Sequence, residues 1–254
     1  MCVQPRINTD KHGLKSLSQQ VLSAFIGVHL WLLMMVYSAY AQESITVAVA
    51  SSFYKKAKVY ATQFEAKHDV AVRLVSGSTG RLYNQIKQGA PFDIWITAGS
   101  QHIDLDNPYK AMGYGYLGIQ LGNRFTTDLQ ELIRHNIYKI GIANPQTVPF
   151  GTAAKQVLAQ AGLWEKLKPK LVYAQNAMQA SMMVNQGLVD AAFVPVQAEQ
   201  AVITRIPYTV FLLSNTAIAK DFYTTLQAAS FPRRRESTFH STLSLDSRLR
   251  GNDR

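Results

Sequence analysis

Residues 75–98, VSGSTGRLYNQIKQGAPFDIWITA, contain the pattern that decides the fold. An apolar strand ends at the small, hydroxyl-rich segment 76–80, and residues 81–88 follow with the apolar spacing of a helix. A glycine and a proline end that helix, and residues 92–97 form the next apolar strand. A strand, a helix and a strand joined by such short links predict part of a mostly parallel α/β sheet.

The same alternation extends on both sides of this stretch. The strand before segment 76–80 spans residues 70–75. We expect further strands at residues 45–49, 138–143, 171–173 and 191–194, and further helices at 53–64, 152–161 and 178–186. Segment 113–124 lies between the two sets and has a looser pattern. The sequence therefore predicts two small α/β lobes, joined near this segment, rather than one long sheet.

The two ends of the chain differ from this body. Residues 21–36, VLSAFIGVHLWLLMMV, are apolar and lead to an Ala-x-Ala site at 39–41, which predicts a signal peptide (1–41) cleaved after Ala41. An uncleaved membrane anchor is the alternative, since the apolar run is just short of a comfortable span of roughly twenty residues. Residues 231–254 contain FPRRRES and SRLRGND, lack apolar periodicity, and predict a disordered tail of foreign origin.

The composition is that of a globular protein, with 47% hydrophobic and 17% charged residues. The net charge is +10, but part of it lies in the arginine-rich tail, and the remaining excess is too weak to indicate nucleic-acid binding. Cys2 is the single cysteine, which excludes disulfide frameworks and cysteine-based metal sites. The sequence has no phosphate-binding loop, nucleophile elbow or dinucleotide fingerprint, so the enzyme classes that need them are excluded.

Small hydroxyl residues follow two of the expected strands, at the ends where open α/β sheets bind ligands. Ser52 comes after the first strand, and Ser78 and Thr79 come after the second. Helices that begin there direct unpaired N–H groups and partial positive charge towards the crevice. The two loops therefore predict a site for a small anion held by neutral donors. The alternative is that Ser52 and Thr79 are ordinary N-caps.

The chain from residue 45 to about 227 resembles the periplasmic molybdate-binding proteins, the solute-binding subunits of molybdate ABC importers. The resemblance rests on ITVAVASS, VSGSTGRLYNQIKQGAPFDIWITA, IGIANPQTVPFGTAAKQVLAQAGLW and LVDAAFV, in this order. It implies an α/β, two-lobed periplasmic-binding-protein fold of type II, with the ligand cleft between the lobes. Lobe 1 would span residues 42–120, with 205–230 returning to it, and lobe 2 would span residues 121–204.

The resemblance also implies a set of ligand-binding residues. The family's hydroxyl positions fall on Ser52 and Thr79, with Ser78 beside the latter, and its backbone N–H donors fall on Phe150 and Ala177. The implied ligand is molybdate or tungstate, bound as an oxyanion without a cofactor or a protein-ligated metal ion. The implied partner is the membrane permease, and we expect a periplasmic monomer that is not an enzyme.

Three features depart from the family pattern. Pro195 stands where some members place a binding tyrosine, and it can supply neither a hydroxyl nor an N–H. The segments 113–138 and 205–213 are shorter than the corresponding segments usually are in the family. Residues 231–254 replace the family's last helix. These departures leave open a binder of another oxyanion, such as sulfate, and a truncated relic that no longer binds. For a third alternative, a serine hydrolase, no histidine or acid partner can be assigned.

Overall fold

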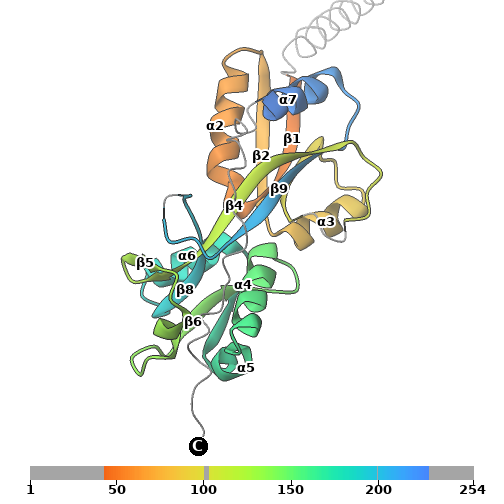
Figure 1. Ribbon diagram of the computed structural model, residues 1–254. Coiled ribbons are helices and arrows are strands. Elements are labelled where there is room, and N and C mark those ends of the chain that lie inside the picture. The colour runs from red at the N-terminus through yellow and green to blue at the C-terminus, as the bar shows by residue number, and fades with distance from the viewer. Residues whose placement is uncertain (1–42, 100–102, 199, 229–254) are drawn as a thin grey trace, which may run out of the picture. The chain divides into compact units, whose positions relative to one another are not determined.

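The computed structural model describes residues 43–99, 103–198 and 200–228 (Figure 1). The predicted signal peptide and the predicted tail, residues 231–254, lie outside the described residues. The described residues from Ser44 onwards form one compact unit, and the fold described below is that of this unit. No helix in the described ranges is both long and apolar enough to cross a bilayer.

Strands and helices alternate along the described chain, and the mixed α/β prediction is confirmed. The strands are β1 (Glu43–Ala50), β2 (Val70–Gly77), β3 (Ile94–Ala98), β4 (Tyr109–Leu121), β5 (Arg124–Thr126), β6 (Ile140–Ala143), β7 (Leu171–Ala174), β8 (Ala191–Val196) and β9 (Thr204–Leu212). The α-helices are α2 (Tyr54–Glu65), α3 (Thr79–Lys87), α4 (Pro149–Gln160), α5 (Trp164–Leu167), α6 (Ala177–Asn185) and α7 (Ala217–Ala228). The 3₁₀ helices are η1 (Ser51–Phe53), η2 (Leu129–Ile133) and η3 (Lys168–Lys170).

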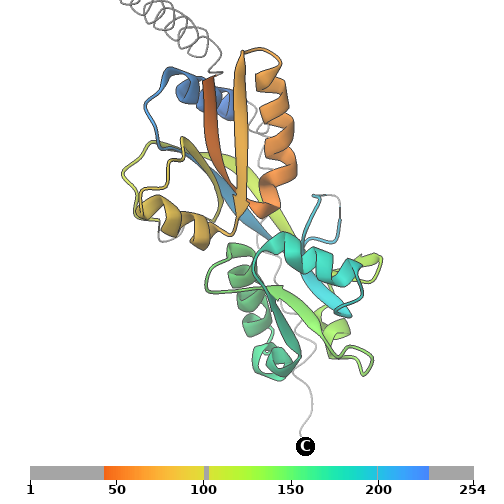
Figure 2. The same cartoon turned by 180° about the vertical axis from the view of Figure 1, so that it is seen from behind.

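The strands of the described residues form one hydrogen-bonded sheet in the order β2-β1-β3-β9-β4-β8-β6-β7, with β5 paired to β4. β1 is parallel to β3, and β6 is parallel to both β7 and β8. β4 and β9 are antiparallel to each other and to their outer neighbours β8 and β3. They run side by side through the middle of this unit in both views (Figures 1 and 2). Parallel pairing is thus confined to the two flanks. The two sets of strands share one hydrogen-bonded sheet, because β4 and β9 pair with strands of both sets, so the expectation that there is no long sheet is wrong.

The segment expected as a loose connection, residues 113–124, lies largely in β4, a strand of 13 residues, so that expectation is wrong. The sequence pattern did not indicate this strand because glycine, which has low strand propensity, occurs in it repeatedly. A Cβ at Gly115 would lie 2.6 Å from the Tyr208 hydroxyl, and one at Gly118 would lie 2.5 Å from the carbonyl oxygen of Ala201. Close packing therefore requires residues with poor strand propensity. The domain boundaries at 120 and 204 stay a prediction.

Helices cover both faces of the sheet around β1 and β3. Val47 of β1 belongs to the main core with α2 and α7, whereas the adjacent Ala48 belongs to a second cluster with Leu82 of α3. Successive strand residues point to opposite faces, so each face has its own helical cover. α7, which the sequence did not predict, packs Phe222 against Phe64 of α2 with ring centroids 4.8 Å apart. Burial on both faces explains the continuous apolar runs.

The flank around β6 and β8 is built in the same way. Ile142 of β6 lies in the main core with Leu158 of α4, whereas Val194 of β8 clusters with Val184 of α6. Helices α4 and α6 follow directly on β6 and β7, just as η1 and α2 follow on β1. The two flanks thus each present helix starts at the ends of parallel strands.

Candidate functional site

Several of these helix starts meet at one cavity. Its volume is about 180 Å³, which includes the part open to solvent. The lining residues are Ala50, Ser51, Ser52, Gly77, Ser78, Thr79, Ala98, Val148, Pro149, Phe150 and Ala177. None of these side chains is ionisable. The cavity is therefore uncharged, although the protein carries a net charge of +10.

Ser52 lies in η1, between β1 and α2. The N-cap of η1 is Ala50 and that of α2 is Phe53, so the interpretation of Ser52 as an ordinary N-cap is wrong. The side chain of Ser52 is hydrogen-bonded to Tyr208 of β9. Burial raises the pKa of the Tyr208 phenol to about 12, and a hydrogen bond with the Ser52 side chain opposes part of that rise. The phenol is therefore neutral at physiological pH and places no charge beside Ser52.

Thr79 is the first residue of α3, and the N-cap is Ser78, whose Oγ accepts a hydrogen bond from the Arg81 N–H at 3.3 Å. The N-cap interpretation is thus wrong for Thr79 as well. The Thr79 hydroxyl donates to the carbonyl oxygen of Ala98 at 3.0 Å. It accepts from the hydroxyl of Thr97, at 3.2 Å. These bonds to β3 fix the position of the Thr79 hydroxyl at the cavity.

Phe150 reaches the cavity through a tight turn between β6 and α4. The Val148 N–H donates to the carbonyl oxygen of Asn144 at 2.9 Å, which closes the turn. A Cβ at Gly151 would lie 2.0 Å from the carbonyl oxygen of Ala143, so glycine is needed for α4 to begin this close to β6. The Gly151 N–H donates to Val148, whereas the Phe150 N–H has no acceptor among the described residues.

Ala177 is the first residue of α6, which follows directly on β7. Asn176 caps this helix, since its Oδ1 accepts from the Gln179 N–H at 2.9 Å. The Gln179 side chain in turn accepts from the Gln175 N–H at 2.6 Å. Such reciprocal capping fixes the position of a helix start. The small, buried side chain of Ala177 lets this start lie against the cavity.

The structure thus brings all of the sequence-predicted site residues to one cavity: Ser52, Ser78, Thr79, Phe150 and Ala177. They come from both flanks of the sheet and from separate parts of the chain. An oxyanion has acceptor atoms only, so hydroxyl and N–H donors without a neighbouring carboxylate suit it.

Pro195, the main departure from the family pattern, does not belong to this lining. It lies in β8 opposite Leu117 of β4, while β6, on the other side of β8, pairs only with Ala191 and Ala192. A proline fits here because one side of the strand has no ladder to which an N–H would donate. Pro195 therefore supplies no atom to the cavity wall.

Sequence analysis missed two features near the cavity: the buried residue Thr97, and a hydrogen bond between Gly80 and Thr147. Thr97 is wholly buried in β3 behind Thr79, and the available signal was a polar residue in an apolar strand. The Gly80 N–H at the start of α3 donates to the carbonyl oxygen of Thr147 at 2.9 Å, just before α4. This bond joins two segments whose neighbouring residues line the cavity.

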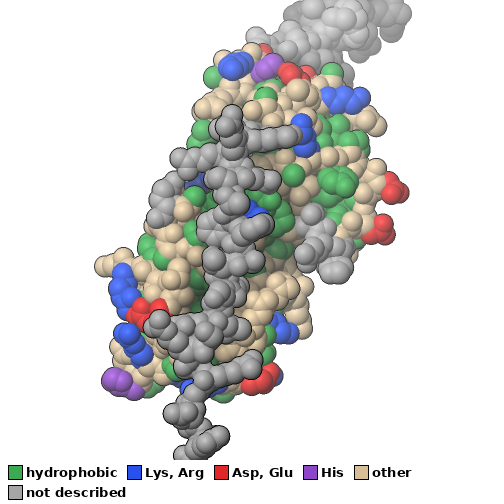
Figure 3. All heavy atoms as spheres, viewed as in Figure 1, with side chains coloured by type: hydrophobic (Ala, Val, Ile, Leu, Met, Phe, Trp, Pro, Cys, Tyr) green, Lys and Arg blue, Asp and Glu red, His purple; other side chains and the backbone are tan. Residues whose placement is uncertain are grey.

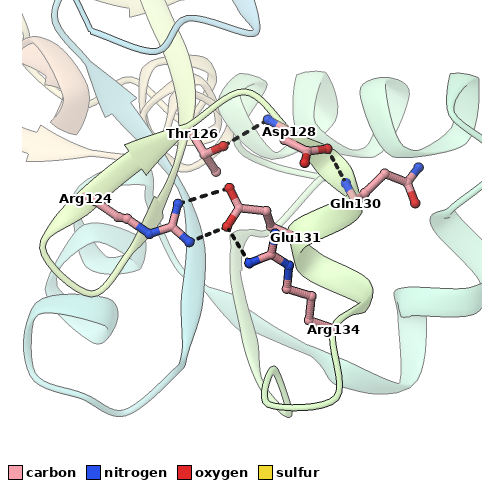
Figure 4. A network of polar contacts seen from close by, with 6 residues as sticks. All are labelled: Arg124, Thr126, Asp128, Gln130, Glu131 and Arg134. Atoms are coloured by element: carbon pink, nitrogen blue, oxygen red, sulfur yellow. Dashed lines mark hydrogen bonds and ion pairs between the residues drawn. The ribbon is translucent and has the colours of Figure 1, made fainter.

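Charged side chains lie elsewhere, and on the face in Figure 3 they are dispersed over several separate places. One connected group joins β5 to η2 (Figure 4). The Arg124 guanidinium donates to both carboxylate oxygens of Glu131, and Arg134 Nη1 lies 3.4 Å from Glu131 Oε2. The hydrogen bond from Arg124 lowers the pKa of Glu131 to about 2. In the described ranges no group of His, Cys, Asp and Glu side chains is arranged to hold a metal ion.

Comparison with known proteins defines the class. The profile of the bacterial extracellular solute-binding proteins matches residues 45–230, and the chain belongs to this family. It is similar to the molybdate-binding protein ModA of Azotobacter vinelandii, with 36% identity over 167 residues, which are 59% of this chain and 64% of that protein. The protein of the same name from Rhodobacter capsulatus is 30% identical over 170 residues, 61% of this chain and 65% of that one.

These alignments span less than two thirds of either relative's length. A solved structure, the periplasmic molybdate-binding protein of Azotobacter vinelandii, superposes with a TM-score of 0.63 and 26% identity. That superposition covers 74% of this chain and 93% of the other. The predicted type II binding-protein fold is therefore confirmed.

Proposed function

We propose that this protein captures molybdate or tungstate outside the cytoplasm and delivers it to an ABC permease. The observation that carries the proposal is the meeting of Ser52, Thr79, Phe150 and Ala177 at one uncharged cavity. The names of the two curated relatives support the choice of ligand. The proposed activity is binding and not catalysis, since the lining holds no ionisable side chain to act as a general acid or base.

In the proposed complex, the oxyanion accepts hydrogen bonds from the hydroxyls of Ser52 and Thr79 and from the N–H groups of Phe150 and Ala177. The starts of α3, α4 and α6 add partial positive charge. No cofactor and no protein-ligated metal ion take part. Because the donors are neutral, the negative charge is supplied by the ligand alone, and selection against sulfate rests on the size of the cavity.

The proposed location and partner follow from the same function. Residues 1–41 would direct export to the periplasm and be removed after Ala41. The mature protein would act as a monomer that presents its loaded form to the membrane subunit of the permease. Closure of the cavity around the ligand would distinguish the loaded form from the empty one.

Isothermal titration calorimetry with molybdate, tungstate, sulfate and phosphate tests this proposal on protein expressed from the full sequence. We expect molybdate and tungstate to bind and sulfate and phosphate not to compete. Replacing both hydroxyls, Ser52→Ala with Thr79→Ala, should weaken molybdate binding by more than about 100-fold, because hydrogen bonds to a charged group are each worth about 1.5–3 kcal/mol. Ser44→Ala, at the exposed start of β1, is the matched control.

Other outcomes separate the alternatives. Preferential sulfate binding would identify a different oxyanion binder. A cooperative thermal transition without any binding would identify a relic of the family. Molybdate binding that the double variant leaves unchanged would show that the ligand lies elsewhere.

A further inference from the structure

We propose that Thr97 is a positioning residue of the oxyanion site: its hydroxyl replaces that of Thr79 as the donor to the Ala98 carbonyl, which frees the Thr79 proton for the ligand. The inference rests on the proposed function. It concerns a residue that does not line the cavity and whose role would be indirect.

The argument begins with the number of hydroxyl protons. Thr79 has one, and in the structure it is directed to the carbonyl oxygen of Ala98, 3.0 Å away. An oxyanion has no proton to contribute, so Thr79 can bind it only by donating. Ligand binding must therefore take the proton away from Ala98.

Thr97 is the group that can compensate for this loss. Its Oγ1 lies 3.2 Å from Thr79 Oγ1, 3.3 Å from the carbonyl oxygen of Ala98 and 3.3 Å from that of Gly99. Rotation of its O–H bond alone redirects the proton from Thr79 to Ala98, with no movement of a heavy atom. Each of the two hydroxyls then still donates one hydrogen bond.

The surroundings of Thr97 favour such an exchange. Its side chain is wholly buried, so its hydroxyl needs a protein partner in both states. A threonine side chain is restricted about χ1, which keeps Oγ1 in place while its proton turns. Thr97 sits in β3, between β1 and β9, where the backbone is held by strands on both sides.

Two substitutions test the role. Thr97→Val removes the hydroxyl and keeps the shape of the side chain, and Thr97→Ser keeps the hydroxyl. We expect Thr97→Val to raise the Kd for molybdate about threefold to tenfold, because the Ala98 carbonyl oxygen then has no hydroxyl donor once Thr79 turns to the ligand. Thr97→Ser should retain the wild-type Kd. The control is Thr209→Val, a buried threonine paired with Thr97 in β9 and outside the lining, which should leave Kd unchanged.

A double-mutant cycle with Thr79→Val completes the test. In that background Thr97→Val should have no further effect on Kd, because there is no Thr79 proton left to release. An equal loss in both backgrounds would overturn the inference. So would a wild-type Kd in Thr97→Val, or a loss of affinity that Thr97→Ser shares. Failure of the wild-type protein to bind any of the four oxyanions would instead overturn the proposed function.

Discussion

The cavity and the group formed by Arg124, Glu131 and Arg134 use opposite means to place polar atoms. In the charged group, a carboxylate with little solvent exposure is paired with two guanidinium groups of the same chain. In the cavity, hydroxyl groups and helix starts are positioned by caps and short turns, and no ionisable side chain is present. In the first arrangement, the positive charges that pair with the carboxylate come from the same chain. The second offers hydrogen-bond donors and has no charged side chain, which is the arrangement expected of a site whose negative charge arrives with the ligand.

This difference shows what each region depends on. The charged group depends on the ionisation state of Glu131, whereas the cavity depends on close backbone packing at Gly151 and on the caps at Ser78 and Asn176. The two regions should therefore respond to different substitutions and to different solution conditions.

The largest effect should come from placing a charge in the cavity. Ser52→Asp puts a carboxylate where a dianion is proposed to bind, and repulsion together with the loss of a donor should weaken molybdate binding by more than about 100-fold. Calorimetry measures the change. Ser44→Asp adds the same charge at the other end of β1, about 25 Å away by strand geometry and well beyond the screening length. Equal effects of the two substitutions would contradict a local, uncharged site.

The next effect concerns packing. Gly151→Ala places a Cβ against the carbonyl oxygen of Ala143 and should lower the free energy of unfolding by about 1–3 kcal/mol, as overpacking does. Urea denaturation measures it as a lower midpoint with an unchanged slope. Gln156→Ala, at an exposed position of α4, is the control and should have little effect. A wild-type midpoint in Gly151→Ala would show that the turn can relax.

A smaller effect is expected in the charged group. Glu131→Gln keeps the size of the side chain and leaves both guanidinium groups without their carboxylate, so the melting temperature at pH 7 should fall. The pKa of Glu131 is lowered to about 2, so its contribution to stability is complete above its usual pKa near 4.5 and is lost as the pH falls towards 2. The difference between variant and wild type should shrink over that range.

The control for this substitution is Glu165→Gln. Glu165 is exposed and lies 3.6 Å from Lys168, and such surface pairs contribute little. If both variants melt at the wild-type temperature, the network of Figure 4 makes no measurable contribution to stability.

The last prediction is that pH has no effect on molybdate binding. Molybdate affinity should stay constant between pH 7 and pH 9, because the lining residues do not titrate and the pKa of Tyr208 is raised to about 12. Calorimetry at several pH values in buffers of equal ionic strength checks this. A tenfold change in Kd over the range would reveal a titrating group at the site.

Much of the fold could be predicted because its flanking strands are buried on both faces and read as apolar runs. Residues 45–49 and 92–97 are clear examples. β4 could not, since Gly115 and Gly118 are required by contacts with residues far along the chain. The need for those glycines exists only in the folded sheet, and no local pattern expresses it.

That Ser52 and Thr79 lie at one cavity could be predicted for a similar reason, whereas their role in binding stays a prediction. Ser52 and Thr79 stand directly after strands, where position in the sequence already indicates position at the sheet edge. Phe150 and Ala177 required the family resemblance, because a backbone N–H donor leaves no signature in its side chain. Thr97 was missed because its importance depends on its distance from Thr79, 18 residues away.

The hydrogen bond from Gly80 to Thr147 has a kinetic consequence. It ties the start of α3 to the turn before α4, so a widening of the cavity between these segments must break it first. In the proposed function that bond would open and re-form once in every round of loading and release. Its strength would then enter the dissociation rate directly, and the time for which an oxyanion stays bound would be set partly by two backbone atoms of residues outside the cavity lining.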